Sequence, residues 1–219
     1  MGTRSMLDRE LAIIRDNVIR MSSLVDEAIE RSYRALRLHD VNLAQTVIND
    51  DANVDDLCTQ IENKVELTVA LQQPTALDLR RVLADLLITT ELERMGDHAE
   101  GISRTVVRFD SDVPMELPAQ LRVMKDGVRD MIRRSMDAYV TQNVELAEEV
   151  GRLDEEVDHA YRGLFDLLVG SMGQEELSVE HGTYLLWAGH NLERIGDRAT
   201  NICERIIYSR TGDVSQLNP

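Results

Sequence analysis

One short motif occurs twice in this chain and constrains its fold more than any other feature. The pattern leucine, glutamate, arginine, apolar, glycine, aspartate, any residue, alanine fills positions 92–99 and returns at 192–199, an offset of 100. In an α-helix, the glutamate and aspartate of each copy lie four residues apart on one face, where two carboxylates repel each other. A glycine in the middle of a helix also costs about 1 kcal/mol relative to alanine. Because the repelling carboxylate pair and the mid-helix glycine recur together, they indicate a structural repeat in which the motif has a specific role.

The repeat extends beyond the motif and divides the chain into two similar halves. Residues 40–44 match 143–147, and residues 51–55 match 154–158, both at an offset of 103. Apolar residues recur every three or four positions along the chain, which is the period of amphipathic helices. The pattern predicts an all-α fold of two tandem three-helix bundles. The six predicted helices cover residues 6–38, 41–71, 76–108, 119–141, 143–171 and 178–208.

The interruptions between the helices fit the same division. Asp40 is placed as an N-cap, and Pro74 ends the second predicted helix because its ring disfavours a helical conformation at Gln73. Two prolines within five positions mark a linker before the second half. We therefore expect a first bundle over 6–108, a linker over 109–118, a second bundle over 119–208 and a flexible tail over 209–219.

The composition restricts the class of partner. The 219 residues carry a formal charge of −16, and only 4% of them are aromatic. This excess of acids argues against nucleic acid or anionic lipid as the main partner and leaves cations and basic protein surfaces. The two cysteines have no C-x-x-C spacing, and no stretch approaches the ~20 apolar residues that a membrane span needs. We expect a cytoplasmic protein with reduced thiols.

The repeat also carries a set of acidic residues in each half. Helical geometry places these acids beside the apolar seam, so we expect shallow, accessible clusters at the edge of the core. Gly96 and Gly196 then mark places where a neighbouring helix or a ligand approaches the backbone closely. The acids are Asp51, Asp55, Glu93 and Asp97 in the first half and Asp154, Asp158, Glu193 and Asp197 in the second.

Metal binding and a solvated acidic face are the two interpretations of these clusters. Carboxylate oxygens from two helices suit hard or borderline cations such as iron, manganese, magnesium or zinc. His190 is a candidate nitrogen ligand three residues before Glu193, although the equivalent position in the first half is Thr90. The simpler interpretation is a solvated surface neutralised by residues such as Arg94 and Arg194, because acidic pairs are common on amphipathic helices.

Through these residues the chain resembles the PhoU family of phosphate-transport regulators. The resemblance rests on the Gln-Pro dipeptide at 73–74, on the Asp-Leu-Arg tripeptide at 78–80 that leads into the first motif at 91–97, and on the second motif at 192–197. The second half lacks an equivalent of the Asp-Leu-Arg tripeptide. The resemblance implies two three-helix bundles and, in some members, multinuclear iron or zinc clusters on the motif carboxylates. The residues that match the family motif are Glu93, Asp97, Glu193 and Asp197, whereas Asp51, Asp55, Asp154, Asp158 and His190 come from the repeat and helix geometry.

The resemblance also implies partners. A protein similar to this family is expected to be a cytoplasmic homodimer that restrains the phosphate ABC transporter, with its ATPase as partner, and signals through a phosphate-sensing histidine kinase. Our leading hypothesis is a metal-binding regulatory adaptor that negatively regulates phosphate uptake and is not an enzyme. An alternative is a di-metal carboxylate oxidoreductase, although that class uses inward-facing Glu-x-x-His pairs that the motif lacks. A third hypothesis is a scaffold whose acidic faces contact a basic partner.

Overall fold

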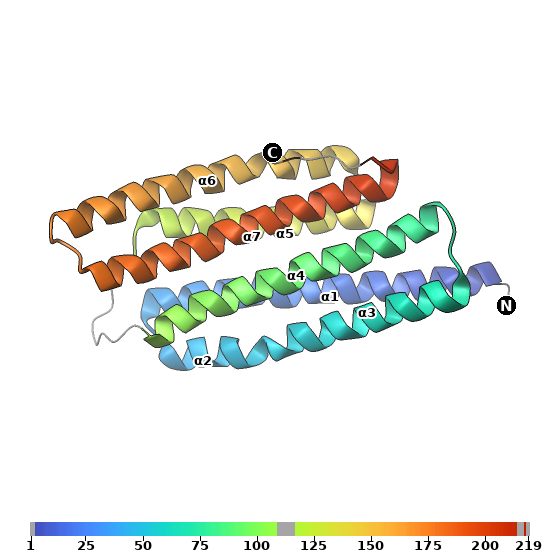
Figure 1. Cartoon of the computed structure of the whole chain (residues 1–219), viewed down its shortest axis with the longest axis horizontal. Helices are drawn as coiled ribbons and strands as arrows, with labels where there is room; N and C mark the ends of the chain where they lie inside the picture. Colours follow the sequence, from blue (N-terminus) through green and yellow to red (C-terminus); the bar gives the residue numbers. More distant parts are fainter. Residues whose placement is uncertain (1–2, 109–116, 214–216, 218–219) are drawn as a thin grey trace.

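The observed helices confirm the predicted fold class. The computed structural model describes residues 3–108, 117–213 and 217, and every regular element in these ranges is an α-helix (Figure 1). The helices are α1 (Thr3–Leu38), α2 (Val41–Asp50), α3 (Ala52–Gln72), α4 (Leu77–Arg108), α5 (Ala119–Thr141), α6 (Val144–Gly173) and α7 (Val179–Thr211). The predicted linker at 109–118 lies mostly outside the described residues. α7 continues to Thr211, beyond its predicted end at 208.

The second predicted helix, 41–71, is divided in the structure at Asp51. The Val54 N–H donates to the Asp51 carbonyl at 2.8 Å instead of to Asp50, whose carbonyl accepts from the Asn53 side chain at 2.9 Å. A local side chain therefore replaces one bond of the helical ladder. Asp51 keeps helical dihedral angles (φ −57°, ψ −34°), so α3 continues in the direction of α2 (Figure 1). The prediction of one unbroken helix is corrected, while the fold class is unchanged.

Both halves begin their second helical segment in the same way. His39 and Gln142, which are equivalent at the offset of 103, end α1 and α5 with positive φ angles of 50° and 55°. The residues that follow, Asp40 and Asn143, are N-caps whose side chains accept hydrogen bonds from the backbone N–H three positions on, at 2.9 and 3.0 Å. The predicted cap at Asp40 is confirmed. These matching helix ends make the sequence repeat a structural repeat as well.

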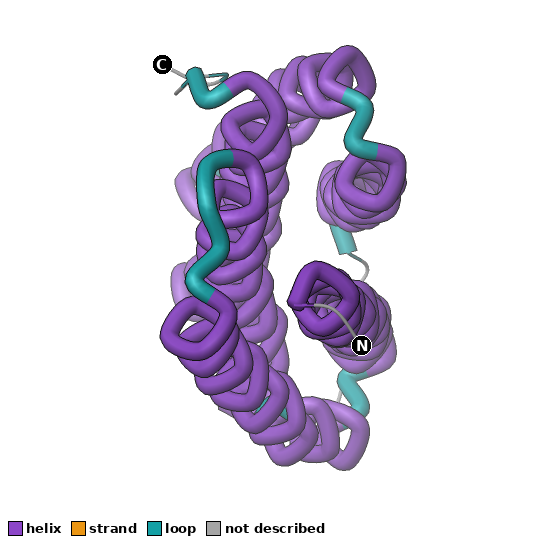
Figure 2. Tube along the Cα trace, turned by 90° about the vertical axis from the view of Figure 1, so that its right-hand side faces the viewer, coloured by secondary structure: helices purple, strands orange, loops and turns teal. Residues whose placement is uncertain are grey.

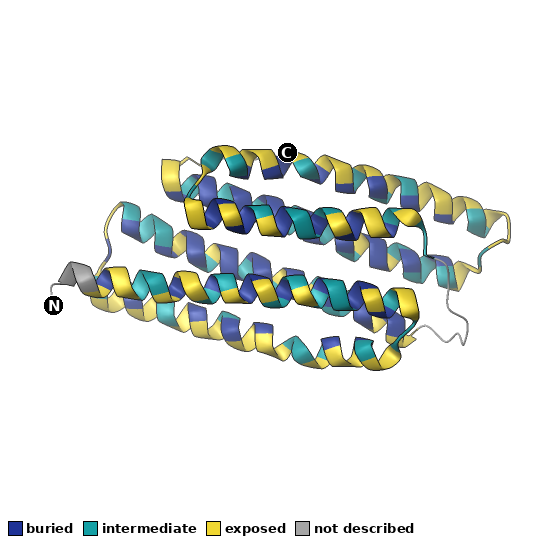
Figure 3. Ribbon diagram, turned by 180° about the vertical axis from the view of Figure 1, so that it is seen from behind, coloured by how far each residue is buried: buried dark blue, intermediate teal, exposed yellow. Residues whose placement is uncertain are grey.

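The helices form a curved row with two helices on its concave side. α3, α4, α7 and α6 follow one another across the row, and α1 and α5 lie together on the concave side (Figure 2). The buried faces of the helices point inward and the outer faces are exposed (Figure 3). One cluster of buried apolar residues runs through both halves, from Ile14 in α1 to Ile206 in α7. None of the described helices is long and apolar enough to cross a membrane.

Two polar contacts related by the repeat join the halves between α4 and α7. Glu91 accepts hydrogen bonds from Arg198 at 3.3 Å and from Asn201 at 3.1 Å. His98 Nδ1 lies 3.0 Å from Asn191 Oδ1. Positions 91 and 191 are equivalent, as are 98 and 198, so these are the same contact made in each direction. The two helices therefore pack antiparallel about a pseudo-twofold axis.

A third contact between the halves is ionic and joins α1 to α5. Arg129 donates from Nε and Nη2 to the two carboxylate oxygens of Asp26, both at 2.7 Å. Glu30 accepts from Arg129 Nη1 at 2.5 Å and from Lys125 Nζ at 3.0 Å. Asp26 and Arg129 are equivalent positions at the offset of 103. The pseudo-twofold axis thus brings together two equivalent positions that carry opposite charges.

Candidate functional site

The first acidic cluster lies where the α2–α3 junction meets α4. A Cβ atom built on Gly96 would lie 3.0 Å from Asp51 Oδ1 and 3.3 Å from Val54 Cγ1, so only glycine gives this carboxylate its full space. The expectation that a neighbouring helix approaches the backbone at Gly96 is confirmed. We call the first cluster the set Asp51, Asp55, Glu93, Asp97 and Glu100.

Burial and mutual repulsion raise the pKa values of carboxyl groups in the first cluster. Burial raises the pKa of Asp51 to about 7, and the charges of the other four members add to this shift. The pKa of Glu93 is raised by burial and then by Asp97 and Asp55. The pKa of Asp97 is raised by burial and then by Asp55 and Glu100. The members therefore lie close enough to oppose one another's ionisation, and a cation among them would relieve the repulsion.

Glu100 is the member of the first cluster that sequence reasoning missed. Its equivalent in the second half is Thr200, so the repeat gave no reason to include it. The available signal was its place three residues after Asp97, on the same face of the helix. The Glu100 carboxylate accepts from Arg104 Nη2 at 2.5 Å, so it adds negative charge at an edge of the cluster that already has one cation.

The second acidic cluster lies between α6 and α7 and consists of Asp154, Asp158, Glu193 and Asp197. Asp154 is only 3% exposed, and a Cβ atom on Gly196 would lie 2.7 Å from its Oδ1. The prediction that all the acids lie at the edge of the core or on the surface is therefore wrong for Asp154. α6 is continuous here, whereas the first half has a helix junction, so this residue packs directly on α7.

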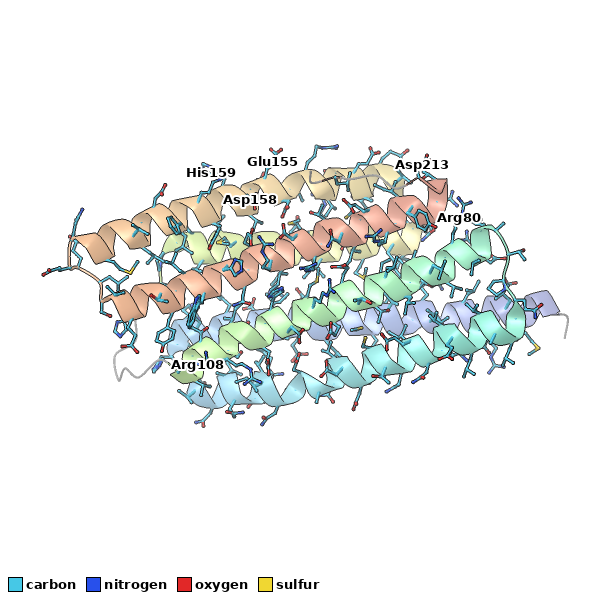
Figure 4. All side chains as sticks on the ribbon, viewed as in Figure 1. Arg80, Arg108, Glu155, Asp158, His159 and Asp213 are labelled. Atoms are coloured by element: carbon cyan, nitrogen blue, oxygen red, sulfur yellow. The ribbon has the colours of Figure 1, made fainter. Side chains whose placement is uncertain are left out.

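The other acids of α6 show how the helix divides its faces. Asp158 lies on the side of α6 that faces α7, whereas Glu155 and His159 point away from the protein (Figure 4). Asp158 is partly buried, and both Glu155 and His159 are exposed. The predicted inclusion of Asp158 thus agrees with its position beside α7.

An arginine occupies the second cluster. Arg194 Nε lies 2.7 Å from Glu193 Oε2, and Arg194 Nη1 lies 2.9 Å from Asp197 Oδ2. Burial raises the pKa of Asp197, and the guanidinium of Arg194 opposes that rise. Arg94 holds the equivalent position in the first half, but it is exposed and forms no ion pair with any described residue. Both clusters therefore contain the glutamate and aspartate of the motif. Among the described residues, the motif arginine forms ion pairs with these acids only in the second cluster.

His190 lies beside the second cluster, as its spacing predicts. Its Nδ1 is 3.5 Å from Glu193 Oε2, and its side chain is half exposed. The equivalent residue, Thr90, donates its hydroxyl to the Leu86 carbonyl at 3.2 Å and takes no part in the first cluster. The histidine is therefore positioned to contact a group bound at Glu193, and its role as a ligand stays a prediction.

The side chains as placed do not form a ready metal cage. Across the part of the chain that the structure describes, no three His, Cys, Asp or Glu side chains converge tightly enough to hold one ion. The first cluster nevertheless offers a set of oxygen donors that suits hard cations. Burial raises the pKa of Asp51, and the charges of the neighbouring carboxylates raise it further, which a bound cation would oppose. By its chemistry the first cluster fits a metal. The second cluster has a guanidinium where a metal would contact Glu193 and Asp197.

Comparison with known proteins gives consistent results for sequence and structure. A family model described as the PhoU domain matches residues 18–106 and again 121–206, one match in each half. A phosphate-specific transport system accessory protein PhoU homologue from Clostridium acetobutylicum is 37% identical over 217 residues, which cover 99% of each chain. A homologue of the same description from Rhizobium meliloti is 35% identical over 95% of this chain and 88% of its own.

Solved structures show the same arrangement of helices. The crystal structure of the phosphate transport system regulatory protein PhoU from Streptococcus pneumoniae superposes with a TM-score of 0.90 at 29% identity, covering 96% of this chain and 99% of that one. The crystal structure of PhoU from Pseudomonas aeruginosa superposes with a TM-score of 0.89 at 28% identity, covering 94% and 99%. The similarity thus includes both helical units and their packing.

Proposed function

The chain belongs to the PhoU family, and from this premise we propose that it is a regulatory accessory protein of phosphate uptake. One observation carries the proposal. The correspondence with a phosphate-specific transport system accessory protein covers 99% of both chains, so it includes both helical units. In this role the protein acts by binding partners and carries out no reaction of its own.

The proposed partners are the ATPase of the phosphate ABC transporter and a phosphate-sensing histidine kinase, and the proposed setting is the cytoplasm. Binding to the transporter restrains phosphate uptake when phosphate is plentiful, and binding to the kinase represses the phosphate response. The formal charge of −16 supports basic protein surfaces as the docking sites, because charge complementarity accelerates association. We also propose that the working form is a homodimer.

The first acidic cluster supports a further part of the proposal, the binding of iron or zinc in a multinuclear site. Asp51, Asp55, Glu93 and Asp97 would hold the metal, because burial and the charges of its neighbours raise the pKa of Asp51 to about 7, and a cation would relieve that repulsion. A bound metal supplies the positive charge that this cluster lacks and so ties the α2–α3 junction to α4. At the second cluster, Arg194 must leave Glu193 and Asp197 before a metal can reach them.

The geometry gives less support to the two other hypotheses from the sequence. A di-metal oxidoreductase needs carboxylates that project into the interior of a helical bundle, whereas Asp55 of α3 and Asp97 of α4 are exposed. A scaffold that only presents acidic faces gives no reason for the close approach of Asp51 to Gly96. Both alternatives remain outcomes of the experiments below.

The regulatory role is tested by deleting the gene in its host and measuring uptake of radiolabelled phosphate by cells in high-phosphate medium. We expect uptake and phosphate-response genes to be derepressed in the deletion strain and to return to normal with the wild-type gene. Unchanged uptake together with unchanged gene expression would contradict the proposal.

Metal binding is tested separately on protein purified without chelator. Elemental analysis should find iron or zinc, and the metal should be removed by chelation and restored by adding back either ion. A protein that contains no metal and takes up none would refute the metal part and leave the regulatory part standing. Turnover of peroxide or oxygen by the iron-loaded protein would instead favour the oxidoreductase.

A further inference from the structure

A further polar site lies outside both acidic clusters, in a cavity of about 360 Å³ between α1, α4 and α5. The cavity lies at the end of the molecule where α1 and α4 begin and α5 ends. Its polar lining consists of Asp8, Arg15, Arg81, Asp85, Tyr139 and Gln142, and these come from both halves of the chain. Nothing in the proposed regulatory role accounts for this group.

The inner wall of the cavity carries a buried carboxyl–phenol pair. Asp85 is 7% exposed and Tyr139 is 4% exposed. The Tyr139 hydroxyl donates to Asp85 Oδ1 at 2.7 Å. Burying a carboxyl group in a helical core is unfavourable unless its environment offers compensation, so this pair needs an explanation beyond packing.

The internal repeat shows that packing alone does not require a polar pair. At the offset of 100, the equivalent of Asp85 is Leu185, and at the offset of 103 the equivalent of Tyr139 is Leu36. Leu185 is buried in the apolar core and Leu36 packs against it as a partly buried residue. The same fold thus has two leucines at the equivalent positions, which the pseudo-twofold axis places at the opposite end of the molecule. The Asp85–Tyr139 pair therefore occurs at only one of the two equivalent places in the repeat.

The other polar groups of the cavity have incomplete internal partners. Among the described residues, the ion pairs of the two arginines are long, 4.0 Å for Arg15 Nε to Asp16 and 3.8 Å for Arg81 Nη1 to Asp78. Both distances exceed those of a direct hydrogen bond. The buried Gln142 Oε1 accepts no hydrogen bond from any described residue, while its amide nitrogen donates to the Tyr139 carbonyl at 2.7 Å. The cavity therefore presents two cationic donor groups and one buried acceptor that lack strong partners.

We propose that this cavity binds a small oxyanion that carries at least one hydrogen-bond donor of its own. The guanidinium groups of Arg15 and Arg81 contact the anionic oxygens, because planar guanidinium groups match oxyanions in geometry and charge. The donor of the ligand is accepted by Gln142 Oε1 or by Asp85. Hydrogen phosphate, a phosphate monoester and a hydroxycarboxylate share this chemistry, and the volume lies in the range of small-molecule sites.

The ionisation of Asp85 is compatible with an anionic ligand. Burial raises the pKa of this carboxyl to about 7, whereas the Tyr139 hydrogen bond and the charges of Arg15 and Arg81 lower it. Near neutral pH a substantial fraction of the Asp85 carboxyl is therefore in its neutral form, which does not repel an anion. The proposed anion site goes beyond the proposed regulatory function and does not depend on it.

The test is isothermal titration calorimetry on the full chain after removal of metal with a chelator. The probes are inorganic phosphate, glycerol phosphate, citrate and sulfate, of which sulfate carries no proton at neutral pH. We expect saturable binding of at least one of the first three, and weaker binding of sulfate. Arg15→Ala and Arg81→Ala should each weaken binding about tenfold, since each removes a charge-assisted contact. Asp85→Leu with Tyr139→Leu, which copies the opposite end of the molecule, should abolish it.

Two control variants make the result specific. Arg122→Ala removes an exposed arginine of α5 whose side chain is 77% exposed, and it should bind the anion as the wild type does. Glu93→Gln with Asp97→Asn should also leave binding unchanged. The proposal is overturned if no probe binds at millimolar concentration, if the single variant Arg15→Ala binds like the wild type, or if only the Glu93/Asp97 variant loses binding. Equal affinity for sulfate and phosphate overturns the requirement for a donor.

Discussion

The two acidic clusters occupy equivalent places in the repeat and solve the same electrostatic problem in different ways. In the first, burial and neighbouring carboxylates raise the pKa values of Asp51, Glu93 and Asp97, and the local arginine of the motif, Arg94, is exposed. In the second, Arg194 lies 2.7 and 2.9 Å from the two motif acids and neutralises them. A duplicated motif therefore does not imply a duplicated function. We propose that the first cluster accepts an external cation, whereas the second already has an internal one in Arg194.

The backbone beside the two clusters also differs between the halves. Asp51 lies at a helix junction and is partly exposed, whereas its equivalent Asp154 lies within a continuous helix and is 3% exposed. Both carboxylates pack against a glycine. Asp51 is partly exposed at a junction and can change its rotamer when a ligand binds, whereas the buried Asp154 cannot move without disturbing the core. The first cluster is thus the adaptable one, and the following predictions test this contrast.

The largest expected effect is on metal affinity. Replacing Glu93→Gln together with Asp97→Asn should weaken binding of zinc or iron about 100-fold or more, because these are the proposed direct ligands and even outer-sphere changes cost 10–100-fold. The matched pair Glu193→Gln and Asp197→Asn should have a much smaller effect. Metal titration of the two variants with a competing chelator makes the measurement.

Equal losses in the two pairs would contradict the contrast between the clusters. Arg194→Gln provides the complementary variant, because it removes the internal cation from the second cluster. It should raise the metal stoichiometry, whereas Arg94→Gln should leave it unchanged.

The next effect concerns the glycines that face the two clusters. Gly196→Ala should lower the free energy of unfolding by about 2 kcal/mol, because the added methyl group meets a buried carboxylate that has no room to move. Gly96→Ala should be nearly neutral, since Asp51 can rotate and the gain in helix propensity of about 1 kcal/mol offsets the crowding. Chemical denaturation of the metal-free proteins measures both values. A larger loss for the Gly96 variant would show that the first cluster is the more rigid one.

A smaller effect is the pH dependence of stability that Asp51 causes. Its pKa is raised from 3.8 to about 7 on folding, so the folded protein keeps a proton that the unfolded chain loses in this window. The free energy of unfolding should therefore fall as pH rises from about 4 to about 7 and stay constant above that range. With allowance for solvent screening of a partly exposed group, the contribution is about 1 kcal/mol.

Asp51→Asn should reduce this slope, while Asp56→Asn, an exposed residue of the same helix, should not. Part of the slope will persist in both variants because the pKa of Asp85 is also raised to about 7. Thermal melts across this pH range compare the three proteins. An identical slope in Asp51→Asn and the wild type would show that the first cluster is already neutralised in solution.

The smallest effect is expected at His190, which distinguishes the second cluster from the first by one side chain. His190→Ala should change stability by at most about 0.5 kcal/mol, since a half-exposed pair at 3.5 Å contributes little. Thermal denaturation measures this change, and a metal titration of the same variant adds a second readout. A loss of metal affinity above tenfold would establish the histidine as a ligand and would make the second cluster the stronger site.

The helices and their ends were predictable from the sequence because their signals are local. The 3.6-residue period, the cap at Asp40 and the break before Pro74 all depend on neighbouring residues in the chain. Arg194 was named from the sequence among the residues that could neutralise the acids, and its partners Glu193 and Asp197 lie on its own helix. The division of the second helix at Asp51 was not predicted, although the bond from Asn53 to the Asp50 carbonyl is local. The burial of Asp154 was not predictable because it depends on how closely another helix approaches, and a single helix contains no information about that distance. The glycines at 96 and 196 were the one local sign of such approaches.

The ionic contact between Asp26 and Arg129 bears on how a duplicated protein keeps its two copies distinct. If two first halves associated as the two halves of this chain do, Asp26 would face Asp26 across the axis, and two second halves would bring Arg129 against Arg129. Like charges at such short range are unfavourable, so either half prefers the other to a copy of itself. The opposite charges at one repeated position therefore favour correct intramolecular pairing over exchange between neighbouring chains, and they explain how similar units can be made in tandem without assembling in the wrong order.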